Sequence, residues 1–347
     1  MTQNQPRREF LRAAAAAGIV GLAGCAGGEE SPTETEPAGE GTPTETTGEG
    51  EDTPTETTEG GAAETRLSWH AGGTGGTYFP LSNEFKQIVE EYTDFTLQVQ
   101  STGASVENVG SLGQGNADFA LIQNDVAFFA KNGTGIDVFE GSAVENLRGV
   151  ATLYPETIHV ITLGDTGITA ITDLSGAVIN TGDLGSGTQV NALQILEAVG
   201  VTEFTEQNTG FSQAADQLRN GDIDAAFVVG GWPVGAIEEL ATTQDIRIVE
   251  ISGDAREQVK EAASWFADDQ IPAGTYNGVE EAVDTVAVQA MIATNAEQPA
   301  ATVEAVTAAI FDHTDQLTIK TEFISRETAQ DGMSIELHPG AEAYFGG

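Results

Sequence analysis

Basic residues are scarce in this chain. Of its 347 residues, 13 are lysine or arginine and 54 are aspartate or glutamate, so the formal net charge is −41. A surface this acidic repels nucleic acids and anionic lipid surfaces, and we expect neither as a direct partner. The same charge repels itself at low salt, whereas molar salt shortens the Debye length to about 3 Å. The composition therefore predicts a protein adapted to a halophilic environment.

Cysteine and clustered metal ligands are also missing. Cys25 is the only cysteine, which excludes an internal disulfide and a cysteine-based metal cluster. The chain has four histidines, which are His70, His159, His313 and His338. They are too far apart in the sequence to show metal-ligand spacing. Ser105 and Ser186 have no histidine or lysine nearby in the sequence that would activate them as nucleophiles. We therefore expect no metal, no cofactor and no enzymatic activity.

The apolar run near the start, residues 13–24, is too short to span a bilayer but fits the apolar region of a signal peptide. The pair Arg7-Arg8 precedes this run, and Leu22-Ala23-Gly24-Cys25 ends it in a pattern that resembles a lipoprotein cleavage box. Residues 1–24 are thus predicted to be a twin-arginine lipoprotein signal peptide, with lipid attached to the sulfur of Cys25. The alternative is an accidental arginine pair before an alanine-rich segment.

Residues 26–65 are rich in Thr, Glu, Pro, Gly and Ser, with alanine as the only apolar type, and they contain twelve acidic residues and no basic residue. Such a composition cannot bury a core. We therefore expect residues 25–65 to form a disordered acidic tether. As a flexible coil, about 40 residues reach roughly 35 Å. That reach suits a link between a lipid anchor and a folded body that starts near Arg66.

Two glycine-rich turns each join a predicted strand to a predicted helix. Residues 182–188 lie between a β-branched run at 177–181 and a helix with apolar residues at Val190, Leu193, Leu196 and Val199. Residues 72–77 lie between a strand at 67–71 and a helix with Leu81, Phe85, Ile88 and Tyr92 on one face. The start of a helix has unpaired N–H groups and a partial positive charge, so it can hold an anion. The alternative is that these residues only form a turn and cap a helix.

The two turns belong to a longer internal repeat. Gly75-Gly76-Thr77 and Ser186-Gly187-Thr188 lie 111 residues apart, and the pattern at residues 112–120 returns 106 residues later at 218–226. Two echoes at nearly one offset predict two lobes of similar α/β build with mostly parallel sheets. Asp118 and Asp224 end the turns of this pattern, and we expect a structural role for both.

Two candidate strands, at residues 157–162 and 284–292, are predicted to cross between the lobes and form a hinge. Lobe 1 is then expected to comprise residues 66–163 plus 287–347. Lobe 2 is expected to be inserted between them, at residues 164–286.

Ten motifs in this order resemble those of the TAXI-type solute receptors of TRAP (tripartite ATP-independent periplasmic) transporters, in their halophilic archaeal type. The resemblance runs over about residues 67–345, and its motifs lie at residues 72–78, 103–108, 123–126, 153–156, 171–176, 185–188, 221–227, 230–233, 271–276 and 337–341. One departure is Ala104, where the family usually has glycine; Ser105 is retained, so we expect the departure to have little effect.

This resemblance implies a type II periplasmic-binding-protein-like fold and a receptor that captures a small anionic solute, such as glutamate, 2-oxoglutarate or another dicarboxylate. The receptor would be lipid-anchored at the extracytoplasmic face of the cell membrane and would deliver its solute to integral-membrane TRAP permease subunits. A substrate-binding lipoprotein of an ABC importer is the alternative. An enzyme on the same fold, as in porphobilinogen deaminase, would need a cysteine or lysine in the cleft. A ligand-sensing partner of a signalling protein is a further alternative.

The ligand contacts implied by the resemblance come from both lobes. Those expected from lobe 1 are Thr77, Tyr78, Ser105 and Asn124. Those expected from lobe 2 are Thr181, Ser186, Gly187, Thr188, Trp232 and Pro233. No arginine lies in these motifs, so hydroxyl groups and the N–H groups of helix starts are expected to hold the anion.

Overall fold

The computed structural model describes residues 65–346. The predicted signal peptide at residues 1–24, the predicted lipid site at Cys25 and nearly all of the predicted tether at residues 25–65 lie outside this part. Thr65, which was expected to end the tether, is the first residue of a strand. Within residues 65–346, no helix combines the length and the apolar character needed to cross a membrane.

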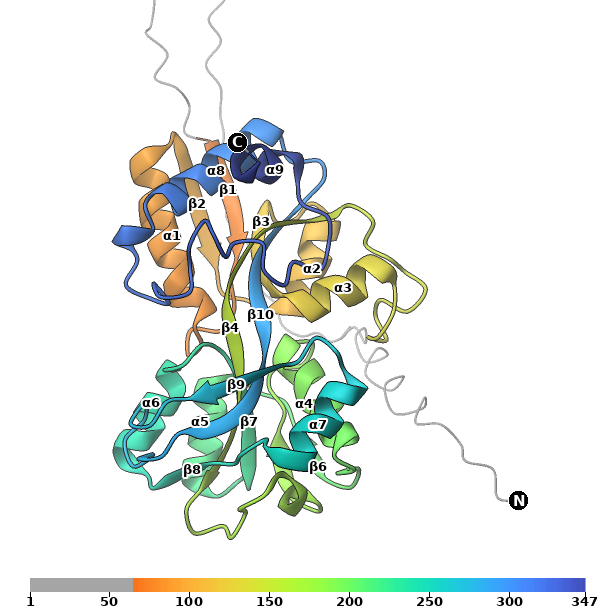
Figure 1. Ribbon diagram of the computed structural model, residues 1–347, viewed down its shortest axis with the longest axis vertical. Coiled ribbons are helices and arrows are strands. Elements are labelled where there is room, and N and C mark those ends of the chain that lie inside the picture. The colour runs from red at the N-terminus through yellow and green to blue at the C-terminus, as the bar shows by residue number, and fades with distance from the viewer. Residues whose placement is uncertain (1–64, 347) are drawn as a thin grey trace, which may run out of the picture. The chain divides into compact units, whose positions relative to one another are not determined.

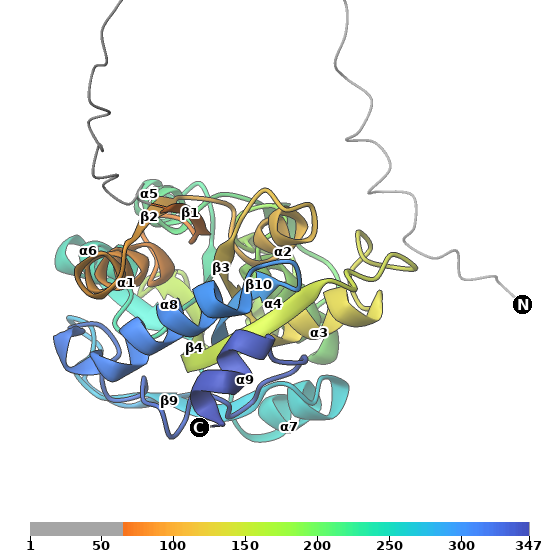
Figure 2. The same ribbon diagram turned by 90° about the horizontal axis from the view of Figure 1, so that it is seen from above.

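Lobe 1 contains the first glycine-rich turn and the two ends of the described chain (Figure 1). Its strands are β1 (Thr65–His70), β2 (Phe95–Gln100) and β3 (Phe119–Gln123). β1 pairs in parallel with both β2 and β3. Its α-helices are α1 (Tyr78–Tyr92), α2 (Ser105–Gly113), α3 (Asn124–Asn132), α8 (Ala300–Asp312) and α9 (Pro339–Phe345). A short 3-10 helix, η2 (Thr314–Gln316), follows α8. Seen from above, α8 and α9 lie over the long strands of this lobe (Figure 2).

Lobe 2 repeats the strand–turn–helix plan around the second glycine-rich turn. Its strands are β5 (Val178–Asn180), β6 (Thr205–Gln207), β7 (Ala225–Val229), β8 (Ile246–Ile248) and β9 (Ala267–Ile271). β5 pairs in parallel with β6 and β7, as β1 does with β2 and β3. Its helices are the 3-10 helix η1 (Ile171–Leu174) and the α-helices α4 (Gly187–Ala198), α5 (Phe211–Asn220), α6 (Gly235–Thr243) and α7 (Gly253–Ala262).

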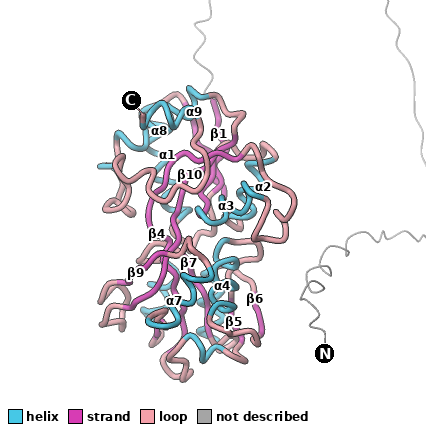
Figure 3. Tube along the Cα trace, turned by 45° about the vertical axis from the view of Figure 1, so that its right-hand side comes forward, coloured by secondary structure: helices cyan, strands magenta, loops and turns pink. Residues whose placement is uncertain are grey.

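Two long strands, β4 (Leu147–Leu163) and β10 (Val283–Asn295), run through both lobes (Figures 1 and 3). They pair antiparallel, from Ala287 opposite Thr157 to Asn295 opposite Leu147. This pair joins the strands of both lobes into one path in the order β2-β1-β3-β10-β4-β7-β5-β6. The predicted fold class, two α/β lobes joined by a two-strand hinge, is confirmed.

The hydrophobic cores show where the chain changes lobe. Tyr154 packs into a core of lobe 1, whereas Ile158 and the residues after it on β4 pack into the cores of lobe 2. On β10 the change falls between Val288 and Ala290. The first crossing therefore comes earlier than residue 164, where lobe 2 was expected to begin. The strand predicted at residues 157–162 is the second half of the longer strand β4, and this half already packs in lobe 2.

The predicted helices exist, and three of the four expected apolar positions of α4 meet a core: Leu196 is buried, and Val190 and Val199 are partly buried. Leu193 is exposed, while Asn191 and Ile195 are also buried. The buried surface of α4 is broader than the expected face because α4 also meets lobe 1, where its polar Asn191 contacts Asp125. In α1 the expected face is buried except at Tyr92, which stacks on His313 instead.

Candidate functional site

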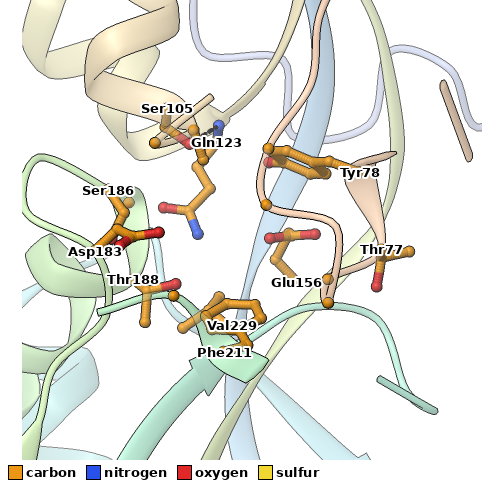
Figure 4. Close-up of a pocket in the computed structure, with 18 residues that line it drawn as sticks. Thr77, Tyr78, Ser105, Gln123, Glu156, Asp183, Ser186, Thr188, Phe211 and Val229 are labelled. Atoms are coloured by element: carbon orange, nitrogen blue, oxygen red, sulfur yellow. Dashed lines mark hydrogen bonds between the residues drawn. The ribbon is translucent and has the colours of Figure 1, made fainter. Parts of the chain in front are cut away.

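A cavity lies between the two lobes, on the side where the predicted glycine-rich turns face each other (Figure 4). Its lining residues come from lobe 1, lobe 2 and the crossing strand β4. The cavity volume is about 60 Å³, which corresponds to about four to six water molecules. A small metabolite fits this space, whereas a peptide or a folded partner does not.

Four helices begin at this cavity. Thr77 and Tyr78 start α1 and Ser105 starts α2 in lobe 1, while Ser186 caps α4 and Gly210 caps α5 in lobe 2. The first N–H groups of a helix have no partner within the helix, and the partial positive charge of its dipole lies at the same end. The four starts therefore give the cavity a favourable environment for negative charge.

The start of α4 is held in place by its own turn. The Oγ of Ser186 accepts a hydrogen bond from the N–H of Gln189 at 3.1 Å, which is an N-cap. The N–H of Gly185 donates to Oε1 of Gln189 at 2.9 Å. Gly182 has a φ of +99°, and a Cβ there would lie 2.7 Å from Cγ2 of Thr188. Only glycine fits this position, and the turn directs Ser186, Gly187 and Thr188 towards the cavity.

The start of α2 carries a strained residue. Ala104, which precedes Ser105, has a φ of 70° and a ψ of −142°. Residues with a Cβ rarely adopt this conformation, which favours glycine. The departure from the family's glycine was expected to have little effect because Ser105 is retained; the structure adds that Ala104 adopts a backbone conformation that favours glycine. The strain leaves the position of Ser105 intact, because its Oγ accepts a hydrogen bond from the N–H of Gln123 at 3.1 Å.

The part of the cavity lining that comes from β4, called its floor from here on, carries the carboxyl group of Glu156. Glu156, on β4, is 3% exposed, and its Oε1 has no hydrogen-bond partner in the described part of the chain. Burial raises the pKa of Glu156 to about 8, against the opposing effects of Tyr154, Gln123 and Lys320. Burial, with the nearby charge of Glu107, also raises the pKa of Asp183, which lines the lobe 2 side. None of the described residues that line the cavity is a lysine, arginine or histidine.

The lobes touch each other on both sides of the cavity. On one side, Oγ1 of Thr77 donates to the carbonyl of Gly231 at 3.2 Å, and Nζ of Lys320 donates to the carbonyl of Trp232. On the other side, Nδ2 of Asn191 on α4 donates to Oδ2 of Asp125 on α3 at 2.8 Å. Direct contacts on both sides mean that this is a closed arrangement of the two lobes.

Six of the ten residues expected to contact ligand line the cavity. They are Thr77, Tyr78, Ser105, Ser186, Gly187 and Thr188. These six lie in the two glycine-rich turns, at the first residue of α1 and at the start of α2. At each place the chain leaves a strand and begins a helix.

The other four expected contacts do not line the cavity. The side chain of Asn124 accepts from the N–H of Gln289 and donates to the carbonyl of Gly332, and Thr181 donates to Oε1 of Glu206 at 2.6 Å. Trp232 packs edge-on against Phe323, and a cis peptide bond joins it to Pro233. The cavity is lined instead by Gln123, one residue before Asn124, and by Asp183, two residues after Thr181.

Sequence reasoning missed several lining residues. The polar ones are Gln123, Glu156 and Asp183, and the apolar ones include Phe211 and Val229. A signal existed for Glu156, because it is a carboxylate between apolar segments in a motif that the resemblance had already marked. Phe211 follows Gly210 at the start of α5, the fourth helix start at the cavity, which the sequence analysis did not reveal.

The histidines stay apart in the fold. His159 is fully buried, with Nδ1 near two backbone carbonyls and Nε2 3.0 Å from the hydroxyl of Tyr276. Burial lowers the pKa of His159 to about 4, so its ring is neutral at pH 7. Among residues 65–346, no group of three or more His, Cys, Asp or Glu side chains has an arrangement that could hold a metal ion.

A family model of the NMT1-like family matches residues 70–346, which is nearly the whole described part of the chain. The chain belongs to the NMT1-like family. Solved structures that resemble this member include the substrate-binding protein of an amino acid ABC transporter, at 12% identity and a TM-score of 0.44, covering 74% of this chain and 96% of that chain.

Two further structures are alkanesulfonate- and aliphatic sulphonate-binding proteins named SsuA. The protein from Xanthomonas axonopodis pv. citri has 14% identity and a TM-score of 0.45, covering 82% of this chain and 85% of that chain. The protein from Escherichia coli has 13% identity and a TM-score of 0.42, covering 82% and 83% respectively. Likeness at this level concerns the fold of this NMT1-like protein and not its ligand.

Proposed function

We propose that this NMT1-like protein is an extracytoplasmic solute receptor that closes its two lobes around a small carboxylate. The convergence of four helix starts on one small cavity between the lobes supports this most directly. Both lobes contribute hydroxyl groups beside these starts, Ser105 from one and Ser186 and Thr188 from the other, whereas the Thr77 hydroxyl donates to the carbonyl of Gly231. A ligand held by both lobes favours the closed state, because it makes its full set of contacts only there.

The available contacts are sufficient for useful affinity without an arginine. A hydrogen bond to a charged group contributes about 1.5–3 kcal/mol. Micromolar binding corresponds to about −8 kcal/mol. Several bonds from N–H and hydroxyl groups therefore reach this range after the ordering costs of association. The distant surface carboxylates oppose an anion only weakly in molar salt, because their fields are screened within a few ångströms.

A membrane permease is the proposed recipient of the solute. We propose the integral-membrane subunits of a TRAP transporter, with the receptor tethered by lipid on Cys25 after export by the twin-arginine route. Reconstitution of receptor and permease in vesicles tests this choice. Uptake driven by an ion gradient without ATP is the expected result. Uptake that requires ATP would contradict it and would favour an ABC importer.

Ligand capture itself is tested by thermal shift of the full chain in molar KCl. The probes are dicarboxylates, 2-oxo acids and amino acids, with neutral sugars of similar size as the control. A ligand present at 100 times its Kd stabilises the folded state by about 2.7 kcal/mol. We expect a rise of several degrees with at least one acid and no rise with the sugars. No shift with any acid would contradict the proposal.

A further inference from the structure

The lining of the cavity has polar atoms that the protein leaves without partners. In the described part of the chain, Oε1 of Glu156, Oε1 of Gln123 and the hydroxyl of Tyr78 are buried and make no hydrogen bond of ordinary geometry, although Tyr154 and Gln123 lie near Glu156 and Ser105 lies near Tyr78. All three residues line the cavity, and their side chains face the same space (Figure 4). A buried polar group without a partner costs about 1–3 kcal/mol, and more when it is charged. Such a group in a binding cavity indicates that a ligand atom supplies the partner.

Two of these three atoms accept hydrogen bonds when Glu156 is ionised, so the partner that is missing in that state is a donor. A carboxylate oxygen accepts only, unless it carries a proton, and an amide oxygen also accepts only. The anion-favouring helix starts lie around the same small space. The cavity thus offers donors at the helix starts, the amide oxygen of Gln123 beside the start of α4, and one carboxyl acceptor, Glu156, on its floor.

No protein cation occupies the donor position. The lining contains two carboxyl groups, those of Glu156 and Asp183, and no basic side chain among the described residues. Lys320 acts on Glu156 through space. Its Nζ, however, donates to the carbonyl of Trp232, and Lys320 does not line the cavity. A ligand with only negative charge would therefore find no compensating cation in the lining, and it would be repelled by either carboxyl group whenever that group is ionised.

We propose that Glu156 determines specificity by accepting a hydrogen bond from an ammonium group of the ligand, so that the solute is a zwitterion such as an α-amino acid rather than a 2-oxo acid. This inference rests on the proposed function, since it concerns the same cavity. The ligand's carboxylate lies at the helix starts, and its ammonium group lies on the floor. An ammonium group has three donors, which suit Oε1 of Glu156 and the oxygen of the Tyr78 hydroxyl. A zwitterion also adds no net charge to an acidic cavity.

The protonation of Glu156 gives this inference a distinctive signature. Because burial raises the pKa of Glu156 to about 8, its carboxyl group is largely protonated at pH 7 in the empty cavity. A bound ammonium stabilises the ionised form and lowers the pKa, so binding releases a proton to the solvent. The other groups that act on Glu156 are Tyr154 on β4, Gln123 at the end of β3, Lys320, and Asp125 on α3. Tyr78 faces it from α1, and Tyr78 and Tyr154 stay protonated at this pH because burial raises the pKa of each.

Isothermal titration with matched ligand pairs tests the inference on the full chain in molar KCl at pH 7. Each pair has the same carbon skeleton, with an amino group in one member and an oxo group in the other: L-glutamate with 2-oxoglutarate, L-alanine with pyruvate, and L-valine with 2-oxoisovalerate. In the best-binding pair we expect the amino acid to bind at least tenfold more tightly. Titrations in buffers of different ionisation enthalpy are expected to show release of between half and one proton per amino acid bound.

The Glu156→Gln variant keeps the shape of the side chain and removes its charge. We expect it to lose most of the preference for the amino acid and all of the proton release. Glu197→Gln, an identical change at an exposed position of α4, serves as the control and is expected to retain both. If Glu156→Gln does not fold, the ligand pairs and the proton count on the unmodified chain still decide the question.

The outcomes separate this inference from the proposed function. If a 2-oxo acid binds as tightly as its amino acid or more tightly, or if amino acid binding releases no proton, the role of Glu156 is overturned while the receptor function stands. If Glu156→Gln keeps the full preference, the role is likewise overturned. If no acid of any pair binds, the receptor function fails and this inference fails with it.

Discussion

Asp118 and Asp224 hold the same position in the two lobes. The Oδ2 atom of each accepts a hydrogen bond from the backbone N–H of a neighbouring strand, Ser68 for Asp118 and Val178 for Asp224, and both distances are 2.7 Å. The backbone carbonyl of each accepts from a threonine on a long crossing strand, Thr294 on β10 and Thr162 on β4. The repeat seen in the sequence is therefore a repeat of contacts, and both aspartates fix a strand at the end remote from the cavity.

We expect Asp118→Ala and Asp224→Ala to lower stability without changing ligand affinity. Asp118 also accepts from Nε2 of Gln298 at 2.5 Å and is partly buried, so its loss is expected to cost about 1–3 kcal/mol. The loss of the exposed Asp224 is expected to cost about 1 kcal/mol. Urea denaturation measures both values. Asp222→Ala, which removes the same charge from an exposed side chain, is the control; equal destabilisation by this variant would refute the explanation.

Two hydroxyl groups at the start of α4 are expected to matter more for binding than for folding. The double variant Ser186→Ala and Thr188→Ala removes both from the cavity lining. We expect at least tenfold weaker binding by titration calorimetry. The lost N-cap of Ser186 is expected to cost only about 1 kcal/mol of stability, so the protein still folds. Ser264→Ala with Thr321→Ala, at two exposed positions, should leave the affinity unchanged; unchanged affinity in the first variant would place the ligand elsewhere.

Gly187 provides a test of closure. A Cβ at this position would lie 2.0 Å from Oε1 of Gln123 and 2.9 Å from Oγ of Ser105, both in the opposite lobe. Gly187→Ala should therefore hinder closure and weaken ligand binding by at least tenfold, although alanine favours the helix itself. Gly110→Ala in α2 is the matched control, because a Cβ there meets no atom within 4 Å. Titration and melting curves of both variants measure the contrast, and equal affinities would contradict it.

The stability of the ligand-free protein should fall as the pH rises from about 7.5 to 8.5. The folded-state pKa of Glu156 is raised to about 8, so above its ordinary pKa the folded state binds more protons than the unfolded state, and its stability decreases with pH. His159, whose pKa is lowered from 6.5 to about 4, opposes this decline until its unfolded form has lost its proton near pH 7.5, and Asp125, whose pKa is raised to about 6, adds to the decline only up to about pH 7. Melting temperatures measured in molar KCl should decline over this window and should decline less in Glu156→Gln. A decline of equal slope in that variant would assign the effect to another group.

Ala104 stores backbone strain that a single change can release. Glycine adopts its positive φ without a Cβ clash, and a residue held in such a conformation costs about 1–3 kcal/mol. Ala104→Gly is expected to raise the free energy of unfolding after a deduction of about 0.5–1 kcal/mol for the added freedom of the unfolded chain. Urea denaturation measures the gain. A loss of stability would show that the strain is smaller than this deduction.

A site residue could be predicted from the sequence where the pattern that marks it spans only consecutive residues. The two glycine-rich turns, with Thr77 and Ser186 beside them, were recognisable because a strand, a turn and a helix start occupy consecutive residues. Asn124 was chosen in place of Gln123 because no local pattern tells which residue at the end of β3 turns into a cavity. Glu156 was missed because the direction of its side chain depends on where β4 passes between the lobes.

The sequence by itself determined the two-lobed α/β plan. Hydrophobic periodicity and glycine positions are local patterns, and the repeat that relates Asp118 to Asp224 is visible when the sequence is compared with itself. The tertiary structure alone decided that helix starts from both lobes surround one cavity and that Glu156 lies buried on its floor. The physical reason is that local patterns specify strands, turns and helix ends, whereas a cavity and the burial of a charge arise only when segments more than a hundred residues apart pack together.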